Sequence, residues 1–448
     1  MTPPSLTDLR RALAAGETSA RELLDAALAA DRHDAYRHVD PEASRAYANA
    51  ADAARKAGID RGPLMGIPVS IKDLYGVPGF PTTGGTAVQL PERFERPGPV
   101  VQRAIEQLAV PTGKTRTVEL AFGGIGTNPR GTPRNPWDAK EHRVPGGSSA
   151  GAGVSLIEGS AALAFGTDTA GSVRIPAAWT GTVGLKTTAR RWSTEGIVPL
   201  SRTLDTAGIL TRTVADAIVA FDALDPRDDS VPERVTAGVR IGRSDGLAWE
   251  SLSPGVGEAV EQALGELIVA GATQHRLELP FLSEAQELFS IGGPVASELY
   301  HFLTTHLPDR LEALDPRVRA RIGDAGNLPV HEYLRRIDRL TELNALATDA
   351  LRDVDVLVMP TVANTPPTVA SLEEPGRYAE ENLLCLRNTC FASYLGLCAL
   401  SMPAGKDAAG MPVGLMLMAR PFQEAHLLAV ARAFERTLGT SAQRLGSP

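Results

Sequence analysis

The sequence predicts an α/β fold, because short apolar runs typical of buried strands alternate along the chain with longer segments of helical spacing. Residues 67–71 and 109–113 form runs of the first kind, and residues 20–30 and 100–108 form segments of the second kind. With 448 residues, 43% of them hydrophobic, the chain can bury the core of one large domain or two ordinary ones.

The first sixty residues are predicted to be helical. Apolar residues recur at helical spacing in 6–15 and 20–30, and 41–57 is rich in alanine. Ser19 and Glu22 have the spacing of a capping box at the start of the second helix. We therefore assign residues 1–60 to a helical layer that packs on the core.

Strands and helices then alternate to the end of the chain. The predicted strands are 67–71, 109–113, 161–165, 182–186, 239–243, 274–279, 354–359, 400–402 and 413–418. The predicted helices are 100–108, 117–122, 213–224, 256–270, 284–307, 330–351 and 424–438. Charge and proline cluster at 225–232, which predicts a boundary between a part at 61–225 and a part at 233–448.

Composition excludes several classes of function. A formal charge of −8 without a dense basic patch argues against nucleic acid as a partner. No window approaches the length of an apolar membrane span, and the N-terminus lacks the pattern of a signal peptide, so we expect a cytoplasmic protein without a membrane partner. The eight histidines are scattered and the three cysteines form no zinc pair, so we expect no metal.

Residues 145–176 concentrate glycine, serine and threonine in two loops. The first is Gly146-Gly147-Ser148-Ser149 and the second is 166–172, with an apolar segment between them. Glycine permits positive φ and close backbone approach, so such loops can turn their N–H groups toward a ligand. From the spacing alone, ordinary glycine-rich turns are an equally good interpretation.

Two short motifs are rejected on their context. Gly113-Lys114-Thr115 ends like a phosphate-binding loop, but the first glycine of that motif would fall on Leu108. Gly147 to Gly151 matches the nucleophile elbow of α/β-hydrolases around Ser149, but no hydrophobic strand precedes it.

Lys72 is unusual because it ends the buried apolar run 67–71. Burial can lower the pKa of a lysine by several units and make the neutral amine available as a base. Asp73 and Asp168 would oppose this effect if they lay close, and a structural ion pair is the alternative interpretation.

These residues together resemble the amidase signature family. The resemblance rests on Gly146 to Ser149, on G-T-D-T-A-G-S-V-R-I-P at 166–176, on Gly184-Leu185-Lys186 and on G-I-P-V-S-I-K-D at 66–73. It also includes Gly113 to Thr115, S-M-P-A-G at 401–405 and P-V-G-L at 412–415. The resemblance implies a single large domain with a mixed, mostly parallel central sheet flanked by helices on both sides, in which residues 233–448 complete the same sheet and the substrate pocket.

The resemblance also implies a catalytic triad without a cofactor. It assigns Ser172 as nucleophile, Ser148 as the bridging serine and Lys72 as base. Backbone N–H groups of Thr169, Ala170, Gly171 and Ser172 would line the oxyanion hole. Ser149, Asp168 and Arg174 would support the site.

The substrate is not determined by the triad. We expect the pocket to be lined by Gly123, Gly124, Ile125, Trp137, Trp179, Trp192 and Ile197, together with the segment near 291–300. Trp179 and Trp192 are equally well explained as core residues. Because these positions carry few charges, we expect an amidase for small apolar or aromatic amides, and also anilides, esters or carbamates, as in aryl acylamidases and urethanases.

Two alternatives remain open at this point. One is the glutaminase component of a tRNA-dependent amidotransferase, and the other is a non-catalytic member of the fold. For the enzyme itself we expect a monomer or a homodimer with a small amide or carbamate as its only partner.

Overall fold

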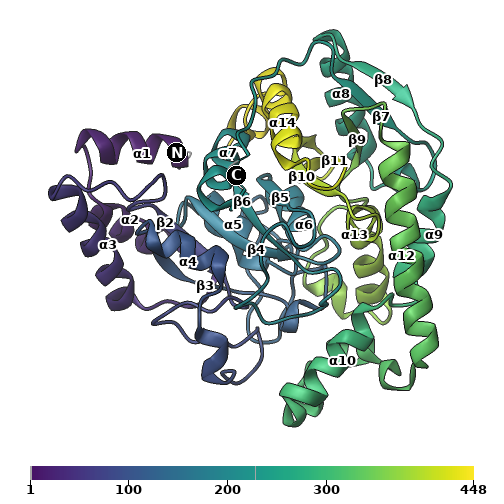
Figure 1. Cartoon of the computed structure of the whole chain (residues 1–448), viewed down its shortest axis with the longest axis horizontal. Helices are drawn as coiled ribbons and strands as arrows, with labels where there is room; N and C mark the ends of the chain where they lie inside the picture. Colours follow the sequence, from purple (N-terminus) through teal and green to yellow (C-terminus); the bar gives the residue numbers. More distant parts are fainter. Residues whose placement is uncertain (1–2, 228) are drawn as a thin grey trace.

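The computed structural model describes residues 3–227 and 229–448. One sheet of eleven strands runs through this described part, in the order β1-β3-β2-β4-β6-β5-β10-β11-β9-β7-β8 (Figure 1). The strands are β1 (Tyr36–His38), β2 (Pro68–Lys72), β3 (Val110–Thr115), β4 (Leu163–Asp168), β5 (Val183–Lys186), β6 (Thr206–Thr211), β7 (Arg240–Arg243), β8 (Thr273–Arg276), β9 (Val356–Pro360), β10 (Cys398–Lys406) and β11 (Pro412–Ala419).

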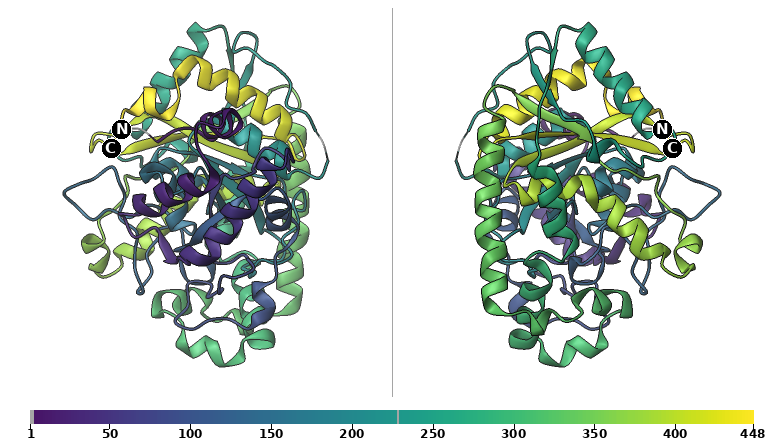
Figure 2. Two further views of the ribbon diagram at one scale, coloured as in Figure 1. Left: turned by 90° about the vertical axis from the view of Figure 1, so that its left-hand side faces the viewer. Right: turned by 90° about the vertical axis from the view of Figure 1, so that its right-hand side faces the viewer.

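Helices flank this sheet (Figure 2). The N-terminal ones are α1 (Leu6–Ala15), α2 (Ala20–Ala30), α3 (Pro41–Lys56), α4 (Pro99–Glu106), α5 (Ala150–Glu158), α6 (Arg174–Thr180) and α7 (Val214–Leu224). The C-terminal ones are α8 (Val256–Val269), α9 (Phe281–Ser290), α10 (Val295–His306), α11 (Pro316–Ile322), α12 (Val330–Ala350), α13 (Arg377–Tyr394), α14 (Glu424–Leu438) and α15 (Ser441–Leu445). The capping box predicted at Ser19 and Glu22 begins α2.

The expected single domain with a mixed sheet between helices is confirmed, but the expectation of mostly parallel pairing is wrong. Among the described strands, four neighbouring pairs are parallel and six are antiparallel. The parallel pairs are confined to β3-β2-β4 and β9-β7-β8. The centre is antiparallel because β10 and β11 form a hairpin, which a short connection permits only in the antiparallel sense.

The two parts of the chain meet inside this sheet. Strand β5 pairs with β10, so residues 183–186 and 398–406 lie side by side in one ladder. The predicted boundary at 225–232 lies between α7 and β7, and residue 228 within it, like residues 1–2 of the N-terminal layer, lies outside the described residues.

Some elements differ from the prediction. The expected helix at 284–307 is two helices, α9 and α10, separated by Gly292, Gly293 and Pro294. Both glycines have positive φ there, and proline cannot continue a helix from α9. Helix α13 escaped prediction because its C-terminal half is buried on all sides, which removes the amphipathic pattern. Nowhere in the described chain does a helix combine the length and apolarity that crossing a bilayer requires.

A buried ion cluster ties α14 to the segment that follows β5. The Glu424 carboxylate accepts hydrogen bonds from the Thr188 N–H at 2.6 Å and from Arg191 Nη1 at 2.8 Å. Arg191 also pairs with Asp225, and both side chains are almost fully buried. Asp229, a further partner of Arg191, keeps 45% of its side chain exposed.

We predict that Glu424→Ala lowers the free energy of unfolding by about 3 kcal/mol, because it leaves the buried Nη1 of Arg191 and the buried Thr188 N–H without the carboxylate that they contact, although Arg191 keeps Asp225. The matched control is Asp229→Asn, which removes an exposed partner of the same arginine and should cost under about 1 kcal/mol. Urea unfolding monitored by circular dichroism measures both. Equal losses in the two variants would contradict this account of the cluster.

Candidate active site

Lys72 is the last residue of β2, an interior strand of the sheet, and its side chain is fully buried. Its Nζ donates to Ser148 Oγ and to Thr167 Oγ1, both at 2.7 Å. Neither acceptor carries a charge. The neighbouring Asp73 lies 3.3 Å from Lys114 instead, so the ion pair with Asp73 that the sequence left open does not form.

Burial dominates the electrostatics of Lys72. Desolvation lowers its pKa to about 7, although the charges of Asp168 and Asp205 act in the opposite direction. At neutral pH a substantial fraction of the Lys72 side chain is therefore a neutral amine. Such an amine can accept a proton from the Ser148 hydroxyl that it contacts.

The first serine loop lies between β3 and α5. The Ser148 carbonyl accepts hydrogen bonds from the Val118 N–H at 3.1 Å and from Thr117 Oγ1 at 2.9 Å, and the peptide bond before Ser148 is cis. Ser148 itself is fully buried. At Gly151 a Cβ would lie 2.0 Å from the Ala35 carbonyl oxygen, so only glycine allows this close approach at the start of α5.

The second loop leaves β4 at Asp168 and brings Ser172 to the wall of a cavity. The Ser149 N–H donates to the Ser172 carbonyl at 3.2 Å, which joins the two loops. Thr169, Ala170 and Ser172 line the cavity, whose volume is about 870 Å³. The structure thus brings Lys72, Ser148 and the second loop into one buried region beside a cavity large enough for a small molecule.

Asp168 and Arg174 form a buried pair under the second loop. Arg174 Nη2 lies 2.8 Å from Asp168 Oδ1, and Arg174 Nη1 donates to the Thr389 carbonyl at 2.7 Å. Burial opposes ionisation of Asp168, but the charges of Arg174 and Lys186 outweigh it and lower the pKa of this carboxyl. Ser149 Oγ donates to the Thr167 carbonyl at 3.4 Å. These contacts favour the predicted supporting roles of Ser149, Asp168 and Arg174, which stay a prediction.

One member of the predicted oxyanion hole is already engaged. The Gly171 N–H donates to Asp168 Oδ1 at 2.7 Å, so it holds the loop instead of facing the cavity. Gly171 has φ +142°, and a Cβ there would lie 2.2 Å from Thr389 Oγ1. Ala170 does not have positive φ, which explains why alanine is tolerated at this position.

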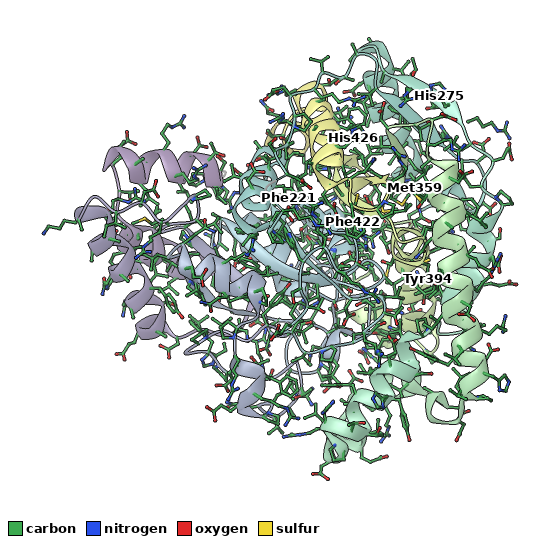
Figure 3. The ribbon with its side chains drawn as sticks, in the orientation of Figure 1. Phe221, His275, Met359, Tyr394, Phe422 and His426 are labelled. Carbon is green, nitrogen blue, oxygen red and sulfur yellow. The ribbon has the colours of Figure 1, made fainter. Side chains whose placement is uncertain are left out.

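The cavity wall agrees with the predicted one only in part. Gly123 and the predicted segment near 291–300, with Ile291, Val295 and Ala296, line the cavity, and so does the unpredicted Tyr394 of α13, which is labelled in Figure 3. Six predicted residues are placed elsewhere: Gly124, Ile125, Trp137, Trp179, Trp192 and Ile197.

These six residues have other packing roles. Gly124 packs on α13, where a Cβ would come within 2.8 Å of Leu386, and Ile125 and Ile197 belong to the core. The tryptophan side chains are anchored by hydrogen bonds of Nε1, from Trp179 to the Asn364 carbonyl, from Trp137 to the Thr180 carbonyl and from Trp192 to Asp225. Trp192 also stacks on Phe221, whose position is labelled in Figure 3. The core interpretation therefore holds for Trp179 and Trp192, whereas Trp137 is half-buried.

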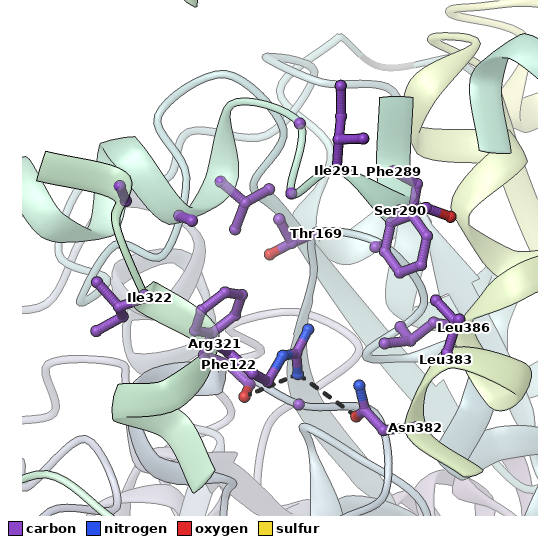
Figure 4. A pocket seen from close by; sticks show the side chains of 18 of the residues that line it. Phe122, Thr169, Phe289, Ser290, Ile291, Arg321, Ile322, Asn382, Leu383 and Leu386 are labelled. Atoms are coloured by element: carbon purple, nitrogen blue, oxygen red, sulfur yellow. Dashed lines mark hydrogen bonds between the residues drawn. The ribbon is translucent and has the colours of Figure 1, made fainter. Parts of the chain in front are cut away.

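The wall also carries charge, contrary to the expectation of few charges. Arg321 projects into it beside Phe122, as Figure 4 shows. Its Nη1 donates to the Phe122 carbonyl at 3.1 Å and to Asn382 Oδ1 at 3.4 Å, and its guanidinium lies over the Phe122 ring at 4.3 Å. Within the described chain no carboxylate pairs with Arg321, whereas the other arginines of the wall, Arg317 and Arg336, pair with Glu373 and Glu332.

Sequence reasoning missed Thr167, Asp205 and Arg321. Thr167 lies inside the matched motif but was given no role, and only the Lys72 contact reveals one. Arg321 lies in the basic stretch at 317–321, whose surface-like composition gave no sign that one guanidinium turns inward. Asp205 is isolated in a loop and offered no pattern.

The profile of the Amidase family matches residues 19–428 of the chain. The chain belongs to this family. Its fold agrees with that of a crystal structure of an amidase, which covers 97% of this chain and all of the other with a TM-score of 0.87 and 32% identity. The peptide amidase of Stenotrophomonas maltophilia superposes with a TM-score of 0.79, at 28% identity over 97% of each chain. The chain is therefore an enzyme of the amidohydrolase type.

Two named relatives are similar along almost the whole chain. The 2-amino-5-chloromuconic acid deaminase of Comamonas testosteroni is 50% identical over 421 residues, which cover 93% of this chain and 91% of the relative. One of the subunits of the glutamyl-tRNA(Gln) amidotransferase of Myxococcus xanthus is 32% identical over 97% of each chain.

We predict that Gly171→Ala destabilises the protein by about 2 kcal/mol, because the added Cβ strains a positive φ and displaces Thr389. Gly265→Ala in α8 is the matched control, since no atom lies within 4 Å of its Cβ position. Alanine is favoured in a helix, so this control should be neutral or slightly stabilising. Thermal unfolding compares the two variants, and a Gly171→Ala protein as stable as the control would contradict the packing described for this loop.

Proposed function

We propose that this chain hydrolyses a C–N bond of a small carboxylate-bearing substrate, with Ser172 as nucleophile, Ser148 as proton relay and Lys72 as base. The observation that carries the proposal is the buried amine of Lys72, which donates to Ser148 beside the loop that presents Ser172 to the cavity. A lysine whose pKa is lowered to about 7 can replace histidine in this role.

On an amide the steps follow from this arrangement. Neutral Lys72 takes a proton from Ser148, which takes one from Ser172, and Ser172 Oγ bonds to the carbonyl carbon. The C–N bond breaks as the protons return along the same path to the leaving nitrogen, so an acyl-enzyme and a free amine result. A water molecule then repeats the addition, releasing the carboxylic acid and Ser172.

The developing oxyanion needs donors that are free to face it. The Gly171 N–H is engaged by Asp168, so the N–H groups of Thr169, Ala170 and Ser172 are the remaining candidates. All three residues line the cavity. Loss of one such donor typically costs about 3 kcal/mol of transition-state stabilisation.

Arg321 supports a substrate that carries a carboxylate. Burial lowers the pKa of Arg321 because it removes the guanidinium from water. The side chains that act in the opposite direction are two tyrosines and a cysteine, and none of them is a carboxylate. An anionic group of the substrate would supply the missing countercharge, in the geometry that guanidinium groups favour. We therefore replace the expected uncharged aryl amide with an anionic substrate.

The name of the 50% identical relative suggests a specific candidate of this kind. A 2-aminomuconic acid carries two carboxylates and an amino group on a carbon–carbon double bond. In its imine tautomer Ser172 Oγ bonds to the C=N carbon as a proton passes to the nitrogen, and ammonia then leaves. Water adds to the same carbon and Ser172 is expelled, so the net reaction consumes one water, releases one ammonia and leaves a ketone. The glutaminase alternative also involves a carboxylate-bearing substrate, but the amidotransferase relative is 32% identical.

A substrate panel tests the proposal: 2-aminomuconic acid with and without 5-chlorine, glutamine, benzamide, p-nitroacetanilide and an aryl carbamate. We expect turnover of the carboxylate-bearing compounds, and a loss of at least about a thousandfold in Ser172→Ala and Lys72→Ala. Ser290→Ala, a serine elsewhere in the same wall, is the matched control and should stay near wild type. Full activity in Ser172→Ala would end the mechanism, and turnover of only the uncharged compounds would end the assignment of an anionic substrate.

We predict that Arg321→Gln raises KM for the carboxylate-bearing substrate by about tenfold to a hundredfold, as expected for a lost hydrogen bond to a charged group. Arg317→Gln is the control, because Arg317 lines the same cavity but already pairs with Glu373. Steady-state kinetics separates KM from kcat. The same increase in both variants would show a general effect of cavity charge instead of a specific contact.

A further inference from the structure

Asp205 lies directly before β6 and binds the loop that carries Ser172. Thr169 Oγ1 donates to Asp205 Oδ1 at 2.6 Å, and the N–H groups of Leu200 and Ser201 donate to Oδ2 at 2.8 and 3.0 Å. In the described residues no basic side chain forms an ion pair with Asp205. The carboxylate is thus held by neutral donors, one of which belongs to the reaction loop.

We infer that Asp205 is a positioning residue of this reaction centre, which fixes Thr169 beside the oxyanion through its hydrogen bond. The inference rests on the proposed roles of Ser172 and Lys72. Asp205 does not contact the reacting atoms itself. It acts through Thr169, which lines the cavity.

The far side of Asp205 is tied to the cavity wall. Glu298 of α10 accepts hydrogen bonds from Ser201 Oγ, from the Thr203 N–H at 3.3 Å and from Tyr333 of α12 at 2.7 Å. Helix α10 also supplies Val295 and Ala296 to the wall of the cavity. Hydrogen bonds therefore connect the segment at 200–205 on one side to α10, which supplies part of the substrate wall, and on the other side to Thr169.

The ionisation of Asp205 determines how this residue changes the pKa of Lys72. Burial raises the pKa of Asp205 to about 6, against the hydrogen bonds of Thr169, Ser201 and Leu200, and the charge of Glu298 adds to the increase. Because this value lies below the Lys72 pKa of about 7, most of Asp205 is ionised at the midpoint of the Lys72 titration. Its negative charge raises the pKa of Lys72. Asp168 acts in the same direction, but its own charge is paired with Arg174. A second cavity of about 500 Å³ also reaches Asp205, and its charged lining residues are Arg103, Arg190, Arg191 and Arg202.

Two variants separate the two effects. Asp205→Asn removes the charge and weakens the hydrogen bond to Thr169, so it should slow the reaction of Ser172 and move its acidic limb to lower pH. Thr169→Val removes the hydrogen bond and keeps the charge, so it should slow the reaction without moving the limb. Thr169→Ser keeps the hydroxyl that donates to Asp205, so it is the matched control for Thr169→Val.

The test is the rate at which a fluorophosphonate probe labels Ser172, measured from roughly pH 5 to 9. This readout does not depend on the identity of the substrate. We expect wild type to show a limb near the Lys72 pKa of about 7. Asp205→Asn and Thr169→Val should each slow labelling at the plateau by about tenfold, only Asp205→Asn should shift the limb downward, and Thr169→Ser should resemble wild type.

An Asp205→Asn profile with the wild-type limb and plateau would overturn the inference, and so would Thr169→Val labelling as fast as Thr169→Ser. If Asp205→Asn does not fold, the comparison of the two Thr169 variants still decides the positioning role. Ser172→Ala separates the two proposals: continued labelling in that variant would refute the proposed nucleophile, whereas wild-type behaviour of Asp205→Asn would refute only the role of Asp205.

Discussion

The site depends on the removal of one lysine from water. Lys72 ends a strand in the interior of the sheet, where β3 and β4 flank it, so its side chain emerges within protein and not at a surface. The resulting desolvation is the largest influence on its pKa and outweighs two carboxylates. A lysine on an edge strand would keep its hydration and its charge. The interior position of β2 is therefore a chemical requirement as well as a structural one.

The neighbouring charges are arranged so that they do not cancel this effect. An unpaired Asp168 carboxylate would favour the ammonium form of Lys72. Here the positive charges of Arg174 and Lys186 offset the negative charge of Asp168. The same carboxylate accepts the Gly171 N–H and the Val173 N–H, so one buried pair both shapes the Ser172 loop and limits the influence of Asp168 on the base. Removing either partner would disturb geometry and proton affinity together.

The sequence was informative where local chemistry decides the structure. The N-terminal helices, the strand that ends in Lys72 and the placement of both serine loops follow from apolar periodicity, a capping box and glycine patterns. The substrate wall was predicted only in part, through Gly123 and the segment near 291–300. It is assembled from segments far apart in the sequence, and it also includes Tyr394 of α13, which no local pattern indicated. Trp179 and Trp192 were expected in the pocket but are core residues outside its wall, whereas Arg321, to which the sequence assigned no role, lines the cavity. Which way a side chain points depends on tertiary packing, which periodicity does not encode.

The most direct measurement of the central claim is the pKa of Lys72 itself. The lysines of the chain are Lys56, Lys72, Lys114, Lys140, Lys186 and Lys406, so NMR of lysine labelled at Cε and Nζ gives a small set of resonances. The one missing in Lys72→Met belongs to Lys72. We predict that it titrates near pH 7, in agreement with its lowered pKa of about 7. A titration near the ordinary lysine value of about 10.4 would contradict the account, because Lys72 would then be an ammonium at neutral pH and could not act as the base.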